Sequence, residues 1–397
     1  TMSLGDYDYK KMAGTLNMPI ADNFAIRATF QSQDREAFKK NIVPGGYDYD
    51  DLDQTVARIR AKWTISDNTS LEISHLLATQ HDMSNAGAVS ADSGNSRGLA
   101  LGGITTTRRD QIASSTTAVE LNPDGPKHYM DSTGIRLETL LAGHSVVLYA
   151  TDSMNDERRF GDYDATSFND IEVAMQENYS DETGAGLEIT SDNDGPLNWI
   201  AGINYFDQTV DYDFDLRIGA IGGGNVPAST AWSHYNLETY GIFASVDYEF
   251  SDRMTLTVGG RYTKEEKDVL TRCSQFPGLA QNQRICLGAA AKPFFLAEDY
   301  TSFDPKVTVT YDLEDSGIIY ATFATGFKSG GFNQPANRGS VPLRPEEIEM
   351  IELGYKTELS DSLRLTSSFF VYDYTDLQVT RAASGGGTVT TENATDS

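Results

Sequence analysis

Hydrophobic and polar residues alternate with a period of two along much of the chain. From Glu349 to Leu359, one parity carries the apolar side chains Ile351, Leu353 and Tyr355, and the other carries mostly polar or small ones. Alternation with one apolar and one polar side is typical of a half-exposed β-strand. A tight turn at residues 360–362 and a second alternating segment follow, so this stretch predicts a β-hairpin.

The same unit recurs along the sequence and predicts about fourteen strands in an all-β protein. The expected strands are Lys10–Met18, Asn23–Asp34, Asp53–Ile65, Leu71–Gln80, Thr133–Leu141, His144–Glu157, Tyr179–Ser191, Leu197–Asp207, Tyr240–Phe250, Met254–Asp268, Ser302–Tyr311, Ile318–Gly326, Glu349–Leu359 and Leu363–Asp376. Their apolar face is rich in aromatic residues, and the opposite face carries charges, glycine and threonine.

Two architectures fit this alternation. A soluble sandwich would bury residues such as Ile351, Leu353, Val258 and Val309 between two stacked sheets. A membrane barrel would instead turn them toward lipid and line a wet lumen with the polar face. Alternation alone leaves both open.

The lengths of the connections favour the barrel. Short turns are expected near residues 21, 67, 143, 194, 252, 315 and 361, with loops of roughly 20 to 50 residues between them. A strand of about ten residues tilted near 40° crosses about 25 Å, the height of an outer-membrane apolar band. We therefore expect a transmembrane antiparallel up-and-down β-barrel, with short turns on one side and long loops on the other.

Composition excludes several other classes of protein. The chain has 397 residues, of which 39% are hydrophobic and 22% charged, and no apolar run is long enough for a transmembrane helix. The net charge of −27 argues against nucleic acid as a partner. Acidic runs such as Asp211–Asp215 fit either a solubilising surface or a cation-attracting rim.

The two cysteines, Cys273 and Cys286, lie in one long polar connection. A disulfide between them would staple that loop and would fit an oxidising compartment or a cell surface. Two free thiols are the alternative. No histidine lies near either cysteine in the sequence, which disfavours a metal site there.

Several blocks of sequence resemble the barrel of TonB-dependent outer-membrane receptors. The most specific are Tyr320–Asn333 (YATFATGFKSGGFN), Arg344–Glu347, Glu352–Lys356 and Phe370–Val379 (FVYDYTDLQV), and weaker similarity begins at Gly5–Tyr7 and Gly14–Pro19. The resemblance implies that residues 1–397 form part of a 22-stranded barrel, without the N-terminal plug domain and some of the strands. It implies outer-membrane lipid, TonB acting through the plug, and a small-molecule ligand as partners.

By this resemblance the protein imports a scarce ligand of the ferric siderophore, cobalamin or glycan type, captured by extracellular loops opposite short periplasmic turns. A passive porin-like channel and the translocator barrel of a surface adhesin are the alternatives. Unpaired backbone groups at an open sheet edge are unfavourable in lipid, so fourteen strands would either close on themselves or belong to a larger barrel.

Candidate site residues are of two kinds. Cations with lumen parity (Arg27, Arg261, Lys306 and Lys356) would pair with the plug, steer an anionic ligand, or pair with neighbouring acids such as Glu352 and Asp304. Aromatic residues expected in loops (Tyr47, Tyr49, Trp232, Tyr235, Phe294 and Phe295) would stack on a ligand or pack the loops together. No set of nucleophile, base and orienting residue can be assembled, so we expect neither an enzyme nor a cofactor.

Overall fold

A computed structural model describes residues 1–82, 111–113, 125–162, 171–191, 195–218, 226–275, 293–333, 341–360, 362–382 and 389–394. Fifteen strands form one antiparallel sheet in which neighbours in sequence are neighbours in space. They are β1 (Met2–Gly5), β2 (Tyr9–Ala21), β3 (Phe24–Arg35), β5 (Leu52–Ser66), β6 (Thr69–Gln80), β8 (Lys127–Leu141), β9 (His144–Asp162), β10 (Ile171–Ser191), β11 (Leu197–Ile218), β12 (Val226–Ser251), β13 (Met254–Gln275), β14 (Phe294–Asp312), β15 (Ile318–Lys328), β16 (Glu346–Ser360) and β17 (Leu363–Thr375).

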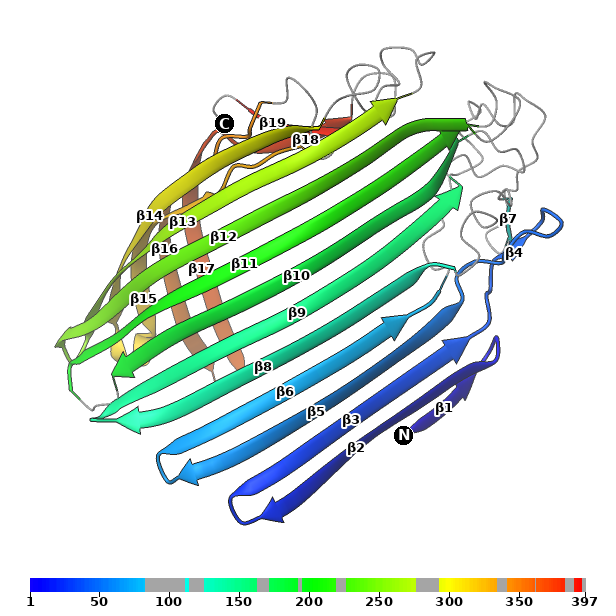
Figure 1. Cartoon of the computed structure of the whole chain (residues 1–397). Helices are drawn as coiled ribbons and strands as arrows, with labels where there is room; N and C mark the ends of the chain where they lie inside the picture. Colours follow the sequence, from blue (N-terminus) through cyan, green and yellow to red (C-terminus); the bar gives the residue numbers. More distant parts are fainter. Residues whose placement is uncertain are drawn as a thin grey trace.

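The sheet curls into an open trough (Figure 1), with β15–β17 turning behind the broad wall of β8–β13. Its two edges are β1 and β17, which do not pair with each other. Two small sheets lie beside it: β4 (Lys40–Asn41) pairs with β7 (Gln111–Ile112), and β18 (Gln378–Ala382) pairs with β19 (Val389–Asn393). A single turn of 3-10 helix, η3 (Glu314–Ser316), joins β14 to β15. Within the described residues, no helix has the length and hydropathy needed to cross a membrane.

All fourteen predicted strands are present in the main sheet, where β1 is an additional one, and the four short strands of the small sheets were not predicted either. The meander order is confirmed as well. Several strands are much longer than predicted, however. β12 has 26 residues, β11 and β13 have 22 each and β10 has 21. At about 3.3 Å per residue, β12 extends roughly 85 Å along its axis, well beyond what an apolar band of about 25 Å requires.

Because the strands are longer than predicted, two of the loops are shorter than predicted. The connection from β9 to β10 comprises only residues 163–170, and that from β11 to β12 only residues 219–225. Neither reaches the 20 residues that were expected. Both faces of these strand extensions carry polar side chains, so the period-two signal fades while the backbone ladder continues.

The two faces of the sheet differ sharply in composition. Residues that pair across strands share a face, and one such row runs Leu137, Leu148, Leu187, Ile203, Ile242, Tyr262 and Phe303. The same face exposes Ile351 (58%), Leu353 (55%), Val258 (45%) and Val309 (39%). A sandwich would have buried these side chains, so that alternative is wrong. This apolar face is the outer face of the trough.

A row of carboxylates marks where the apolar band ends on the outer face. Asp207, Glu238, Glu266 and Asp299 pair across four consecutive strands. Directly below them, the rings of Tyr205 and Tyr240 lie 5.1 Å apart, and the Tyr240 hydroxyl donates to Glu238 at 2.8 Å. Ionised groups are unfavourable in hydrocarbon, whereas tyrosine suits the membrane interface. Residues of β11–β14 beyond this row therefore lie outside the membrane.

Candidate functional site

The connection between β15 and β16 lies against the inner face of the sheet. We call its described parts, Ser329–Asn333 and Val341–Pro345, the strap. The Lys267 ammonium of β13 donates to the Gly330 carbonyl oxygen at 2.9 Å and to the Ser329 hydroxyl. The Tyr300 hydroxyl of β14 donates to the Leu343 carbonyl oxygen at 3.1 Å. The two parts of the strap are also bridged by backbone hydrogen bonds between Gly331 and Leu343.

Glycine at position 330 lets the strap approach the wall closely. A Cβ atom at Gly330 would overlap both the Leu343 carbonyl oxygen and the Tyr300 ring. At the neighbouring Gly331, a Cβ atom would meet no other atom within 4 Å. Only the first glycine is therefore required by packing.

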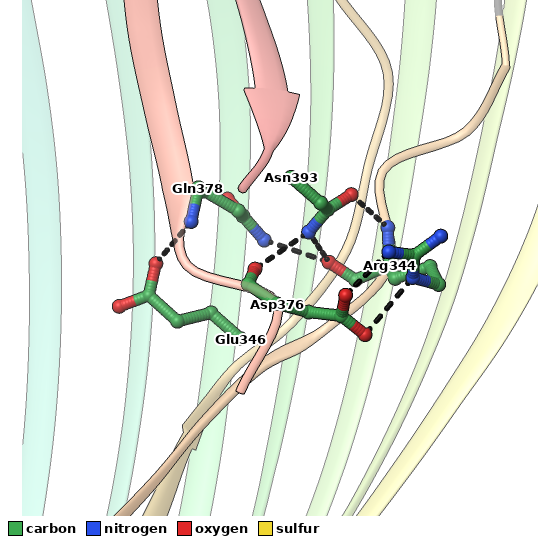
Figure 2. A network of polar contacts seen from close by, with 5 residues as sticks. All are labelled: Arg344, Glu346, Asp376, Gln378 and Asn393. Carbon is green, nitrogen blue, oxygen red and sulfur yellow. Dashed lines mark hydrogen bonds and ion pairs between the residues drawn. The ribbon is translucent and has the colours of Figure 1, made fainter. Parts of the chain in front are cut away.

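Side-chain amides hold the outer end of the strap against the hairpin of β18 and β19 (Figure 2). The Gln378 Nε2 group donates to the carbonyl oxygens of Ser329 at 3.0 Å and Arg344 at 3.1 Å. The Asn393 Nδ2 group donates to the carbonyl oxygens of Arg344 at 2.9 Å and Asp376 at 2.7 Å. These bonds satisfy backbone acceptors that have no partner in the main sheet.

An ion pair completes this network. The Arg344 guanidinium donates to both carboxylate oxygens of Asp376, with Nε to Oδ2 at 2.9 Å (Figure 2). Asp376 adopts a positive φ of 55° in the turn after β17, a conformation that aspartate tolerates better than most residues. The hydrogen bond from Arg344 and its charge lower the pKa of Asp376 below its usual value.

We expect acid to release the strap. Because the pKa of Asp376 is lower in the folded than in the unfolded state, the pair stabilises the network above the unfolded value. That contribution is lost as the pH falls through the folded value. Amide hydrogen exchange at residues 341–345 should therefore rise at acidic pH in the wild type. In an Asp376→Asn variant the exchange should already be high at neutral pH, and equal exchange in both proteins at neutral pH would contradict this role.

The strap and the inner wall line an open pocket of about 410 Å³. We call it the wall pocket. Its aromatic lining is Tyr212 of β11, Tyr235 of β12 and Phe332 of the strap, joined by the aliphatic side chains of Val210 and Leu343. The polar lining comes from Asn178, Ser233 and Gln378 together with the two strap glycines. In the part of the chain that the structure describes, none of the lining residues is an acid, a lysine, an arginine or a histidine.

Two polar groups at the pocket have no partner within the described part of the chain. These are the Tyr235 hydroxyl and the Asn178 carboxamide, whereas the Ser233 hydroxyl lies 3.0 Å from that of Thr271. Burial, with a smaller contribution from Glu265, raises the pKa of Tyr235 well above its usual value. A mostly apolar cavity with a few convergent polar groups is typical of a small-molecule site.

Lys267 is expected to control whether the strap stays against the wall. Its ammonium lies 2.9 Å from the Glu265 carboxylate, and both side chains are largely shielded from solvent. A Lys267→Met change removes the bonds to the strap and leaves Glu265 buried without its partner, which costs about 3 kcal/mol. Hydrogen exchange at residues 329–333 should increase. A matched Lys264→Met change, on the outer face of the same strand, should leave it unchanged.

The predicted lumen cations lie on the inner face but are not gathered into one site. Arg261 donates to Asn204 at 2.8 Å and to Thr263 at 3.0 Å. Lys356 lies 5.2 Å from the centre of the Tyr320 ring, and Tyr320 donates to Glu352. Arg27 and Lys306 are exposed on β3 and β14. Within the described residues, none of the four cations pairs with a carboxylate, so the expected pairing with neighbouring acids is not formed.

The predicted loop aromatics need correction. Trp232, Tyr235, Phe294 and Phe295 lie in strands β12 and β14, because these strands continue where loops were expected. Cross-strand pairing puts Trp232 and Phe295 on the outer face, away from the lumen. Tyr235 lines the wall pocket. Tyr47 is exposed and Tyr49 is buried, both in the connection from β3 to β5. A role in ligand contact stays a prediction for these residues.

The disulfide also stays a prediction. Cys273 is buried near the end of β13 and is not a free thiol, whereas Cys286 lies outside the described residues. Peptide mapping of the full-length protein under non-reducing conditions should recover a peptide that joins the two cysteines. Finding both peptides unlinked would contradict the assignment.

Four residues that line the wall pocket are not indicated as site residues by the sequence patterns: Asn178, Tyr212, Phe332 and Gln378. Phe332 and Gln378 do fall within the blocks of family resemblance, which was the available signal. Asn178 and Tyr212 lie in strand extensions whose weak alternation gave no indication of which face they occupy. No group of three or more potential metal ligands occurs among the described residues.

Comparison with known proteins identifies the family. A family model described as "TonB dependent receptor-like, beta-barrel" matches residues 3–397. The chain belongs to this family. Its members are barrels of the bacterial outer membrane, so the short turns of this chain are periplasmic and the strap and wall pocket lie toward the cell exterior.

Individual relatives agree with this assignment. A rhizobactin receptor from Rhizobium meliloti (strain 1021) is 26% identical over an alignment that covers 36% of this chain and 22% of the relative. The solved ferric yersiniabactin uptake receptor FyuA from Yersinia pestis has a TM-score of 0.75 and 13% identity, covering 95% of this chain and 54% of that one. The siderophore receptor PiuA from Acinetobacter baumannii has a TM-score of 0.67 and 15% identity, covering 95% and 57%. The chain thus spans little more than half the length of these two solved receptors.

Proposed function

We propose that these residues are the barrel wall of an outer-membrane receptor that binds a scarce small-molecule ligand from outside the cell and imports it. The energy would come from TonB, acting through a plug domain. Siderophore is the ligand class that the names of several relatives suggest. Family membership supports a transport receptor rather than an enzyme.

The observation that carries this proposal is the wall pocket. It lies on the inner face, beyond the row of carboxylates that ends the apolar band, where a ligand arriving from the exterior would first meet the wall. The strap that lines one side of it is held by hydrogen bonds from Lys267, Tyr300 and Gln378, so this side of the pocket is preformed. Preformed sites avoid part of the ordering entropy of binding.

Uptake by the full-length protein tests the proposal. Cells that lack their own siderophore receptors would express it, and accumulation of ⁵⁵Fe would be measured with a panel of ferric siderophores, with and without functional TonB. We expect saturable uptake of at least one complex that disappears without TonB. Uptake that rises linearly with concentration and ignores TonB would indicate a passive channel. A large passenger domain exposed at the cell surface would indicate a translocator.

A further inference from the structure

We infer that the wall pocket binds an uncharged aromatic group of the ligand, such as a phenol or an aryl amide, and disfavours carboxylates and other ionised groups. The inference rests on the proposed function, because it names the chemistry of the part of the ligand that the pocket would hold.

The volume and lining of the pocket fit an aromatic ring. A volume of about 410 Å³ lies within the range of about 300–1,000 Å³ typical of small-molecule sites. Three aromatic side chains, Tyr212, Tyr235 and Phe332, come from three separate segments and converge on this volume. Offset or edge-to-face contacts between rings contribute about 0.5–1.5 kcal/mol each beyond the burial of their area.

The electrostatics exclude an ionised group. Among the described residues, no charged side chain lines the pocket, and the nearby Lys267 ammonium is already occupied by Glu265, the Ser329 hydroxyl and the Gly330 carbonyl oxygen. Burial, with a smaller contribution from Glu265, raises the pKa of the Tyr235 phenol well above its usual value, so this phenol stays neutral at physiological pH. A buried charge without a partner is strongly unfavourable.

Two groups are available to orient a neutral polar substituent. The Tyr235 hydroxyl and the Asn178 carboxamide lack partners among the described residues and together offer donors and acceptors. A phenol or a carboxamide can satisfy both kinds of group. An aliphatic ligand would leave them unsatisfied, which is unfavourable for a buried polar group.

The test uses two probes of the same size and shape, 4-hydroxybenzamide and 4-hydroxybenzoate, in which a neutral carboxamide replaces an ionised carboxylate. Binding to the purified full-length receptor in detergent would be measured by saturation-transfer difference NMR. We expect the amide to bind at least about tenfold more tightly than the carboxylate, because desolvating the unpaired charge exceeds the 1.4 kcal/mol that a factor of ten represents.

Variants localise the binding. Tyr235→Ala should weaken binding of the amide about tenfold. Gly331→Trp should abolish it, because the indole would occupy the pocket from a lining position where a Cβ atom meets no other atom within 4 Å. Tyr240→Ala, on the outer face of the same strand, is the matched control and should leave binding unchanged. Retained heat-modifiable migration in gels would show that each variant is folded.

Equal or tighter binding of the carboxylate, absence of binding by the amide, or binding unaffected by both pocket variants would overturn the inference. Each of these outcomes is distinguishable from failure of the proposed function. TonB-dependent uptake in cells decides whether the protein is a transport receptor, and that result can stand even if the pocket has a different preference.

Discussion

Replacing Val307 by arginine is expected to lower the free energy of unfolding in lipid by about 2–4 kcal/mol, the range measured for a cation on the lipid face near the bilayer midplane. Val307 lies on the outer face of β14, where it pairs with Val258 and Phe323, and its side chain is exposed beside these apolar neighbours. An arginine there has no acceptor within the apolar band. Urea unfolding in lipid vesicles, followed by tryptophan fluorescence, would measure the destabilisation in the full-length protein.

The control lies on the same strand. Thr310 belongs to the inner face, where it pairs with Thr255 and Tyr320, and a Thr310→Arg change places the new charge in the wet lumen. The neighbouring Lys306 shows that this face of β14 already carries a cation. We expect a change below about 1 kcal/mol for this variant. Equal destabilisation by the two arginines would mean that the two faces have been assigned wrongly.

This expectation depends on an assignment of faces that the sequence allowed in advance. In the membrane-level parts of the strands, one face must be apolar and the other polar, so the period of two appears plainly in segments such as Tyr240–Phe250 and Met254–Asp268. The order of the strands could also be predicted from the sequence, because short turns join neighbouring strands in an up-and-down meander. Both features reflect local chemistry that repeats every second residue.

The strand extensions could not be predicted in this way. Beyond the row of Asp207, Glu238, Glu266 and Asp299, both faces of the wall are wet, so hydrophobic alternation no longer distinguishes a strand from a loop. The pairing that continues there is made by backbone groups, which leave no mark on composition. Trp232 and Phe295 were expected in loops for this reason.

The candidate site was only partly accessible from sequence. Tyr235 was singled out as an aromatic residue, but its partners in the pocket come from segments far apart in the chain, such as Asn178 and Gln378. The meeting of β10, β12, the strap and the start of β18 depends on how strongly the sheet curls. It also depends on Gly330 and Lys267, which let the strap fold inward. Neither condition follows from a pattern within one segment.

Substituting alanine for each of the two adjacent strap glycines is expected to affect ligand uptake very differently. In Gly330→Ala, the methyl group would overlap the Leu343 carbonyl oxygen and the Tyr300 ring, so the strap must move away from the wall. Overpacking of this kind costs about 1–3 kcal/mol, and the movement would also break the hydrogen bond from Tyr300 to Leu343. We expect ligand uptake to fall about tenfold or more and hydrogen exchange at residues 341–345 to increase.

In Gly331→Ala, the methyl group meets no other atom within 4 Å, and the backbone there has no positive φ that would disfavour alanine. This variant should keep wild-type exchange and lose at most a small part of its uptake, because one methyl group occupies little of the pocket. Both variants carry the same glycine-to-alanine change at adjacent positions, so each is the control for the expression and membrane insertion of the other. Equal loss of uptake in both would show that the strap tolerates no change at all, and equal retention would show that its contact with the wall does not shape the pocket.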